Sequence, residues 1–184
     1  MRNYFESLEA EIRSALVGRT LSRVVYAAQH QAGRRWQRQG FHLVEAGVGL
    51  IPDHGPPVYI ARDDQNCFEA GVGELTEAAR AIRQDLLLFD AGDTPEWAPW
   101  RRSPVASVQI SWEGMFLDEA SQVLVLFKDL ELRSEDGQSL CISIGEELWP
   151  DEEPEGRLYF DPAGEIYLTF DPELQARMRR GSFA

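Results

Sequence analysis

Three histidines are the residues of this sequence that could most readily bind a metal ion. His30, His42 and His54 recur at intervals of twelve residues, and Cys67 or Asp53 could supply a further ligand. Zinc sites bring three or four such ligands together, and motifs such as HExxH and CxxC fix their spacing. Neither motif accompanies these histidines. The sequence therefore predicts no metal site and no cofactor.

Two glycine-rich stretches and one acidic loop match ligand-binding motifs only in part. GVGL at 47–50 and GVGE at 71–74 begin as nucleotide-binding loops do, but both lack the third glycine and a Gly-Lys-Thr sequence. We therefore expect turns at both places. Residues 63–74 have the length of a calcium-binding loop. Cys67 and Phe68 stand where that loop needs an oxygen ligand and a glycine, so no calcium site is expected.

No pairing of a nucleophile with a base is evident in the sequence. Cys67 has no partner that the sequence nominates, and Cys141 lies in an alternating apolar segment where a small buried residue is normal. Neighbouring carboxylates occur, but pairs are inevitable among 31 acidic residues. We therefore predict no catalytic residues. The alternative is an enzyme, or a domain that binds a small ligand or metal in a pocket between sheet and helices. In that case Asp63, Asp64 and His54 are the first candidates for the site.

An arginine-rich stretch, GRRWQRQG at 33–40, combines positive charge with an aromatic side chain. Such a combination can stack on nucleic-acid bases, but a net charge of −13 argues against binding to a phosphate backbone. Arg and Trp are also the residues most enriched in protein interfaces. Plain surface, a nucleic-acid contact and a protein interface all remain open. We include Arg34, Arg35 and Trp36 in the predicted partner-binding set.

The strongest charge feature is the segment EELWPDEEPEG, from Glu146 to Gly156, which holds six carboxylates. Pro150 and Pro154 keep it out of regular structure, so it is expected to be a loop between two strands. Trp149 adds an apolar anchor, and a focused negative potential steers basic partners. The remaining predicted partner-binding residues are Trp149, Asp151, Glu152, Glu153, Glu155, Glu135 and Asp136.

Composition bounds the class of protein. The 184 residues are 43% hydrophobic and 27% charged, which is typical of one ordinary globular domain. Residues 113–175 carry seventeen acidic residues against three basic ones, whereas residues 1–42 carry seven Arg against three Glu. No apolar run approaches a membrane span of about 20 residues, and the acidic N-terminus does not match a signal peptide. Two cysteines are too few for a disulfide framework. We therefore expect a cytoplasmic protein.

Periodicity predicts an α+β fold of mainly antiparallel strands with about three helices. Phe5, Leu8, Ile12 and Leu16 have helical spacing, a second helix is expected from Thr76 through Asp90, and Asp171-Pro172 opens a third. Residues 63–75 are expected to be a loop. The predicted strands lie at 20–29, 41–51, 57–62, 105–112, 122–133, 139–144, 157–160 and 165–170, with the last two forming a hairpin around DPAGE.

Two predicted hairpins share one pattern. A shift of 82 residues places Val48 on Leu130, Leu50 on Leu132, Gly55 on Gly137, Val58 on Leu140 and Ile60 on Ile142. Any two hairpins with equal turns would match in this way, so coincidence and duplication both stay open. We expect a single domain over residues 1–184. The alternative is an internal pseudo-repeat of 19–92 and 101–170, joined by the Pro/Trp-rich connector 93–104.

These features favour a small acidic binding protein that captures a basic protein partner. In general character the chain resembles the immunity proteins of bacterial toxin systems, which are short, acidic, single-domain proteins without catalytic motifs. A toxin that acts on an anionic substrate needs a basic cleft, and an acidic surface could fill it. Arginine replaces lysine almost everywhere, as in high-GC bacterial genomes, and Lys128 is the only lysine. The resemblance implies no residue correspondence.

Overall fold

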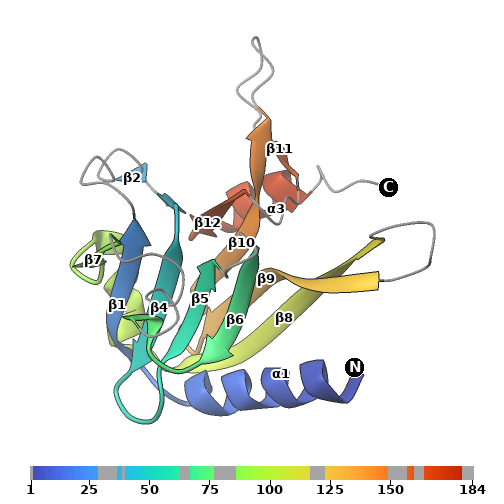
Figure 1. Ribbon diagram of the computed structural model, residues 1–184. Helices are drawn as coiled ribbons and strands as arrows, with labels where there is room; N and C mark the ends of the chain where they lie inside the picture. Colours follow the sequence, from blue (N-terminus) through green and yellow to red (C-terminus); the bar gives the residue numbers. More distant parts are fainter. Residues whose placement is uncertain are drawn as a thin grey trace.

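The chain folds into two antiparallel sheets with a helix at each end, as expected for an α+β fold (Figure 1). The structure, a computed structural model, describes residues 2–28, 37–38, 40–62, 67–76, 86–116, 123–148, 157–159 and 164–179. The helical elements are α1 (Arg2–Leu16), η2 (Pro95–Trp97), η3 (Pro99–Arg101) and α3 (Pro172–Arg179). The strands are β1 (Leu21–Ala28), β2 (Gln37–Arg38), β3 (Phe41–Val44), β4 (Gly47–Pro52), β5 (Val58–Arg62), β6 (Phe68–Val72), β7 (Leu87–Asp90), β8 (Val105–Phe116), β9 (Val123–Ser134), β10 (Ser139–Leu148), β11 (Arg157–Tyr159) and β12 (Glu165–Thr169).

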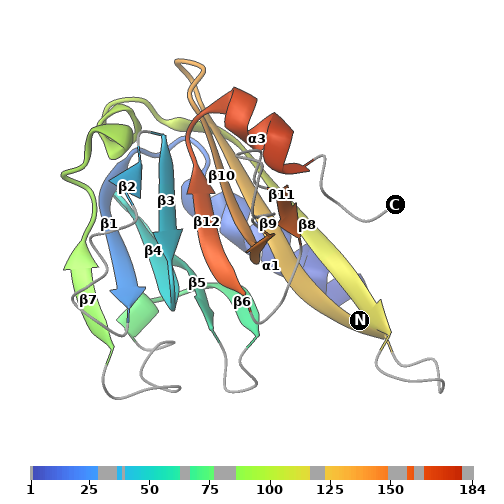
Figure 2. The ribbon, with the colours of Figure 1, turned by 90° about the horizontal axis from the view of Figure 1, so that it is seen from above.

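Strand order separates the chain into a five-stranded and a seven-stranded sheet. The five-stranded sheet runs β6-β5-β4-β1-β7, and the seven-stranded sheet runs β2-β3-β12-β10-β9-β8, with β11 paired to the far end of β10. Figure 2 shows the strands of both sheets from above, and the two helices α1 and α3 lie away from each other. No helix of the described residues is long and apolar enough to cross a membrane.

One apolar core lies between the two sheets. It combines inward side chains of both sheets with Ile12 and Leu16 of α1, which are fully buried, and with Trp97 and Trp100 of the connector. The predicted spacing of α1 is therefore confirmed, because its apolar stripe is the face that packs on the core. The two Trp side chains are at most 1% exposed, so the connector contributes to the core and not to the surface.

The structure corrects two predictions in the first half of the chain. Residues 41–51 are not one strand, because Glu45 and Ala46 bend the chain and carry it from β3 in one sheet to β4 in the other. Residues 63–75 are not a loop throughout, because Phe68–Val72 forms β6 and pairs with β5. Gly71 made this segment look like a turn.

The predicted helix from Thr76 to Asp90 is wrong at its C-terminal end. Leu75 and Thr76 are already helical, so Thr76 does not cap the helix from outside, and residues 77–85 lie outside the described part of the chain. Leu87–Asp90 is β7, which pairs antiparallel with β1. Backbone pairing with an existing sheet therefore overrides a helical apolar spacing here.

The C-terminal region bears out one prediction and corrects another. Asp171 Oδ1 accepts a hydrogen bond from the Glu173 backbone N–H at 2.8 Å, and α3 begins at Pro172, as the sequence predicts. Residues 157–160 and 165–170 do not form a hairpin with each other in the described pairings. Both β11 and β12 pair with β10, β12 along Cys141–Gly145 and β11 along Glu146–Leu148.

The two hairpins that match by sequence also match in register. The paired residues are Leu50–Val58 and Val48–Ile60 in β4–β5, and Leu132–Leu140 and Leu130–Ile142 in β9–β10. All eight side chains are at most 1% exposed. Both turns place a glycine in the left-handed region, with φ of +92° at Gly55 and +87° at Gly137.

The match extends to the strand that precedes each hairpin. The β1–β4 register slips between Leu21 and Arg23, and the β8–β9 register slips between Val105 and Ser107, at the equivalent point of each ladder. A backbone hydrogen bond of 2.9 Å closes each end in the same way, from Asp53 N to Thr20 O and from Glu135 N to Pro104 O. β6 and β12 then continue the two sets. The chain therefore contains two antiparallel sets of strands, β1-β4-β5-β6 and β8-β9-β10-β12, of like register, and their origin by duplication stays a prediction.

Glycines flatten the outer face of the five-stranded sheet. A Cβ on Gly47 would lie 2.7 Å from Leu75 Cδ1, and a Cβ on Gly71 would lie 2.6 Å from Tyr59 Cζ. The turns predicted at the two glycine-rich stretches are wrong for GVGL, which lies wholly in β4, and for Gly71 and Val72, which end β6. At Gly47 and Gly71 neighbouring side chains lie directly against the backbone. Tyr59 lies over Gly71, and its hydroxyl donates to Glu69 Oε1 at 3.1 Å.

We predict that Gly71→Ala lowers the free energy of unfolding by about 1–3 kcal/mol, because the Tyr59 ring must move away from the added methyl group. Urea unfolding measures the change. The same substitution made together with Tyr59→Ala should be less costly than in the native background, which gives a favourable coupling in the double-mutant cycle. Equal costs in both backgrounds would contradict a direct ring contact.

Candidate functional site

A chain of polar groups crosses the core between the two sheets. Trp97 Nε1 donates to Tyr26 Oη at 2.9 Å, and Tyr26 Oη lies 2.7 Å from His42 Nδ1. His42 Nε2 faces Glu96 Oε2 at 3.5 Å. Tyr26 belongs to β1 of the five-stranded sheet, whereas His42 belongs to β3 of the seven-stranded sheet. The chain therefore ties the two sheets and the connector together.

The direction of these bonds follows from what each group can do. An indole N–H only donates, so Tyr26 accepts from Trp97 and uses its own proton toward His42 Nδ1. His42 then carries its proton on Nε2, where the Glu96 carboxylate can attract it. The opposite tautomer would turn a lone pair toward that carboxylate.

Burial controls the protonation of both titratable groups in the core. Desolvation lowers the pKa of His42 below its ordinary 6.5, although Glu96 acts in the opposite direction. Desolvation likewise raises the pKa of the Tyr26 phenol well above its ordinary value, against the lowering effect of the Trp97 hydrogen bond. A protonated His42 would use both ring nitrogens as donors and leave the Tyr26 proton without an acceptor. Both groups are therefore neutral near pH 7.

A Glu–His–Tyr sequence is also the arrangement of an acid–base relay, but here only the Glu96 side chain reaches solvent, with 17% of it exposed. Tyr26 and His42 are 0% exposed, and Phe170 and Trp97 pack edge-on within the same cluster. A general base must come within hydrogen-bond reach of its substrate. These side chains cannot do so in this conformation, so their role here is structural.

One concave surface among the described residues lies beside α1. A groove of about 420 Å³ is lined by Ser7, Ala10, Glu11, Ser14, Ala15, Arg19, Pro56 and Val72. Glu11 accepts a hydrogen bond from Ser7, and Arg19 Nη1 donates to the Ala15 carbonyl at 2.8 Å. The groove thus has one acidic and one basic side chain, each held by α1, and lies where the sequence alternative expects a pocket between sheet and helix.

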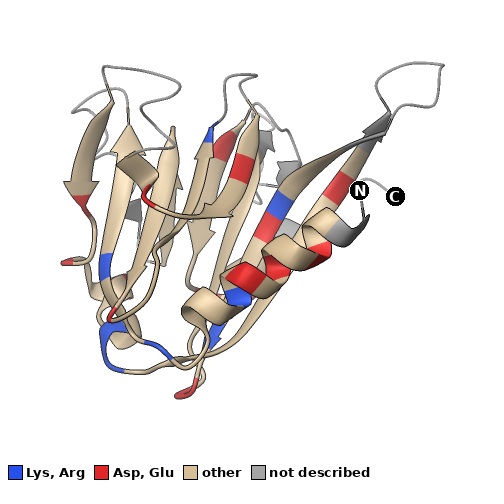
Figure 3. Ribbon diagram, turned by 60° about the horizontal axis from the view of Figure 1, so that its bottom comes forward, with Lys and Arg blue, Asp and Glu red and all other residues tan. Residues whose placement is uncertain are grey.

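Acidic side chains lie on the outer face of the long strand β9. Asp129 and Glu131 alternate with the buried Leu130 and Leu132, so the two carboxylates point to the same face. Their cross-strand neighbours on β8 and β10 are uncharged: Ser111 and Ser143 beside Asp129, and Gln109 and Cys141 beside Glu131. Figure 3 shows further acidic residues along α1.

The turn from β9 to β10 continues this acidic line. Glu135 and Asp136 are both exposed. The Ser134 hydroxyl donates to Asp136 Oδ1, and the Asp136 backbone N–H donates to Ser103 Oγ at 3.1 Å. The Ser134 hydrogen bond is the main reason that the pKa of Asp136 lies below its ordinary value. Asp136 therefore shapes the turn, whereas Glu135 projects from it. We call Asp129, Glu131, Glu135 and Asp136 the acidic face.

The other predicted site residues divide into two groups. Arg34, Arg35, Trp36, Trp149, Asp151, Glu152, Glu153 and Glu155 lie outside the described residues, as do His30, Asp63 and Asp64. Among the described ones, His54 pairs with Asp53 at 2.8 Å on the exposed β4–β5 turn. His42, in contrast, is fully buried. No group of three or more metal-binding side chains occurs among the residues that the structure describes.

Sequence reasoning did not find the Trp97–Tyr26–His42–Glu96 chain. Its members come from β1, β3 and the connector, and no spacing relates them. No protein-family model matches this chain, and comparisons with curated proteins and with solved structures give no match either.

We predict that Tyr26→Phe lowers the free energy of unfolding by about 2–4 kcal/mol, because Trp97 Nε1 and His42 Nδ1 both lose their partner in the core. Tyr59→Phe is the matched control, since its hydroxyl bonds to Glu69 at the surface and its loss should cost about 1 kcal/mol or less. Chemical denaturation of both variants decides the comparison. Similar losses of unfolding free energy in the two variants would contradict a stabilising role for the Trp97–Tyr26–His42–Glu96 chain.

We predict that stability falls as the pH drops below 6.5, because unfolded His42 takes up a proton that the folded protein rejects. The free energy of unfolding keeps falling until the pH reaches the lowered pKa of His42 in the folded protein, with a slope of up to about 1.4 kcal/mol per pH unit. His42→Gln should remove that part of the slope, whereas His54→Gln on the exposed turn should keep it. Urea midpoints between pH 5 and 8 test this, and an unchanged slope in His42→Gln would refute it.

Proposed function

We propose that this protein binds a basic protein partner, and that the acidic face is part of the contact surface. The observation that carries the proposal is the placement of Asp129 and Glu131 on the same face of β9, in a half of the chain where acidic residues outnumber basic ones. β-sheet pairing fixes these carboxylates relative to one another. A fixed array of charge loses little entropy when a partner docks.

The charge balance of the second half supports the same proposal. Among the described residues from 105 onward whose side chains are placed, eight are acidic, and Lys128 and Arg133 are the only basic ones. Lys128 is engaged with Glu113 at 2.7 Å. Clusters of one sign raise the association rate with oppositely charged partners and select against like-charged ones. A cationic protein fits this surface better than a nucleic acid does.

The most specific form of this proposal is a bacterial inhibitor of the immunity or antitoxin type, located in the cytoplasm. Its partner would be a toxin whose basic active-site cleft accepts an anionic substrate. The acidic face would cover that cleft, and the carboxylates of residues 146–156 would add to it. The predicted loop is wrong at its start, because Glu146–Leu148 belongs to β10. This inference rests on charge, size and the type of protein that the sequence resembles.

A second function, the binding of a small polar molecule, is favoured by the groove beside α1. Glu11 and Arg19 could meet the two ends of a zwitterion there. Thermal shift with metals and metabolites would separate the two functions. Stabilisation that is lost in an Arg19→Gln variant would favour the groove.

We predict that Glu131→Gln combined with Glu135→Gln weakens the complex roughly 2- to 30-fold, because exposed charge pairs contribute about 0.2–1 kcal/mol each. Both substitutions leave Asp136 and its turn intact. The partner is first captured from host lysate and identified by mass, and then measured as a purified protein by calorimetry at two salt concentrations.

The matched control removes two exposed charges elsewhere, with Glu74→Gln and Asp53→Asn. It should bind within about twofold of the native protein if the acidic face makes the contact. Equal weakening by both pairs would show that only net charge matters. Capture of no basic protein, or of a partner indifferent to salt, would overturn the proposal.

A further inference from the structure

Strand β7 leaves an apolar edge on the five-stranded sheet. It is the last strand of that sheet, and among the described residues only β1 pairs with it. Leu87 is 40% exposed and Leu88 is 41% exposed, and these are two of the four exposed large apolar side chains among the described residues whose side chains are placed. Edge strands usually carry charges that block pairing with another chain. Leu87 and Leu88 carry none.

The backbone of β7 offers hydrogen bonds outward at Leu88. Ala91 N donates to Val24 O at 2.8 Å, so residues 91, 89 and 87 direct their polar groups toward β1. The alternation of an antiparallel ladder then turns the N–H and C=O of Leu88 away from β1. The same alternation puts Leu87 and Leu88 on opposite faces of the strand.

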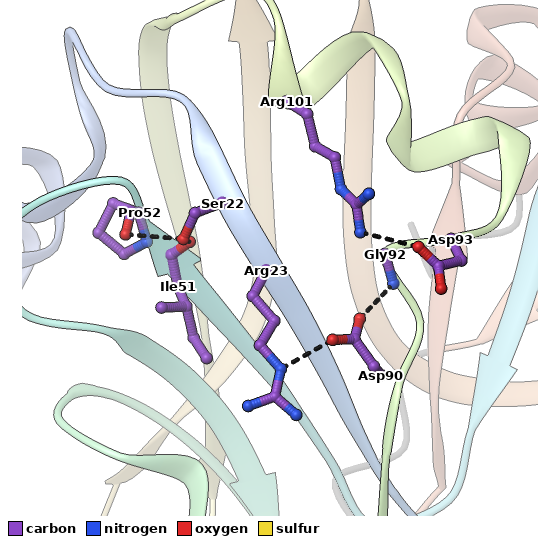
Figure 4. A network of polar contacts seen from close by, with 8 residues as sticks. All are labelled: Ser22, Arg23, Ile51, Pro52, Asp90, Gly92, Asp93 and Arg101. Carbon is purple, nitrogen blue, oxygen red and sulfur yellow. Dashed lines mark hydrogen bonds and ion pairs between the residues drawn. The ribbon is translucent and has the colours of Figure 1, made fainter.

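Charges next to β7 are compensated locally. Arg23 Nε donates to Asp90 Oδ2 at 2.8 Å, Gly92 N donates to Asp90 Oδ1 at 2.9 Å, and Arg101 pairs with Asp93 at 3.3 Å (Figure 4). Desolvation raises the pKa of Asp90, but the hydrogen bonds from Gly92 and Arg23 and the nearby arginine charges outweigh it and hold that pKa below its ordinary value. Two copies of a chain with net charge −13 repel each other over most of their surface. At this edge Asp90 and Asp93 are each paired with an arginine, which reduces that repulsion.

We propose that β7 pairs with β7 of a second copy, so that two five-stranded sheets join into one across a twofold axis. An axis at Leu88 sets Leu88 opposite Leu88 of the other copy and Leu87 opposite Phe89. Every pair in the centre of this ladder is then apolar, on both faces. The outward N–H of Leu88 donates to the C=O of Leu88 in the second copy, and the reverse bond forms as well, which satisfies both sets.

A covalent test exploits the symmetry. In a hydrogen-bonded antiparallel pair the facing Cα atoms lie about 5.5 Å apart, within the range of a disulfide. In a Cys67→Ser background, Leu88→Cys should therefore form a disulfide-linked dimer on mild oxidation, whereas Leu87→Cys, which faces Phe89, should do so far less. Equal cross-linking of the two variants, or none, would overturn the proposed register.

Oligomeric state is measured by light scattering and sedimentation, from low to high micromolar protein. The native chain should be a dimer that strengthens with added salt, because salt screens repulsion between acidic copies. The acidic-face complex should instead weaken with salt, so the two proposals can fail separately. Leu88→Pro removes the outward N–H without breaking the β1–β7 ladder, and Leu88→Lys places a charge on the axis.

Both Leu88 variants should be monomers at concentrations where the native chain is a dimer. Tyr4→Ser is the matched control, since Tyr4 is more exposed at 66% but lies on α1. It should remain dimeric. A native chain that stays monomeric, or a dimer that survives Leu88→Lys, would overturn the proposal. If Leu88→Pro fails to fold by circular dichroism, Leu88→Lys alone decides.

Discussion

The hydrogen bond between Tyr26 and His42 is the contact on which the relation of the two sheets depends. It is 2.7 Å long, fully buried, and joins β1 of one sheet to β3 of the other. Apolar packing alone permits neighbouring sheets to slide, because it is not directional. A buried donor and acceptor permit only one alignment, since separation would leave both unsatisfied at a cost of about 1–3 kcal/mol each. The Trp97 indole extends this constraint to the connector.

The same contact explains why the connector is buried. Pro95 and Pro99 open two short 3-10 turns, and each turn presents one Trp to the core. Trp97 Nε1 needs an acceptor there, and Tyr26 is the acceptor that β1 supplies. A segment rich in Pro and Trp therefore became part of the core, although its composition is typical of an exposed linker.

Local patterns predicted the elements whose cause is local. The apolar spacing of α1, the Asp171 cap of α3 and the glycine turn at Gly137 all follow from a few neighbouring residues, and the structure has each of them. β6 and β7 were missed because distant residues decide them. Tyr59 occupies the space above Gly71, and β1 supplies the ladder that converts Leu87–Asp90 from an expected helix to a strand. The Tyr26–His42–Trp97 chain was beyond prediction for the same reason, since its three residues meet only after both sheets have formed.

The sequence did indicate the acidic turn at Glu135 and Asp136. It could not indicate that Asp136 is held by Ser134 while Glu135 is not.

The two proposed surfaces are compatible because β7 and β9 belong to different sheets. β7 ends the five-stranded sheet, whereas β8 ends the seven-stranded sheet, and Figure 1 shows β7 far from the long strands β8 and β9. A twofold axis at β7 would therefore leave the acidic face of each copy open. It would also set the two acidic faces far apart, where screening at physiological salt makes their repulsion small, because the Debye length is about 8 Å. A dimer of this kind would present two separate acidic faces, each able to meet its own basic partner. The local charge compensation around Asp90 then has a physical reason, since it lets an acidic chain approach itself at one edge while the acidic face stays negative.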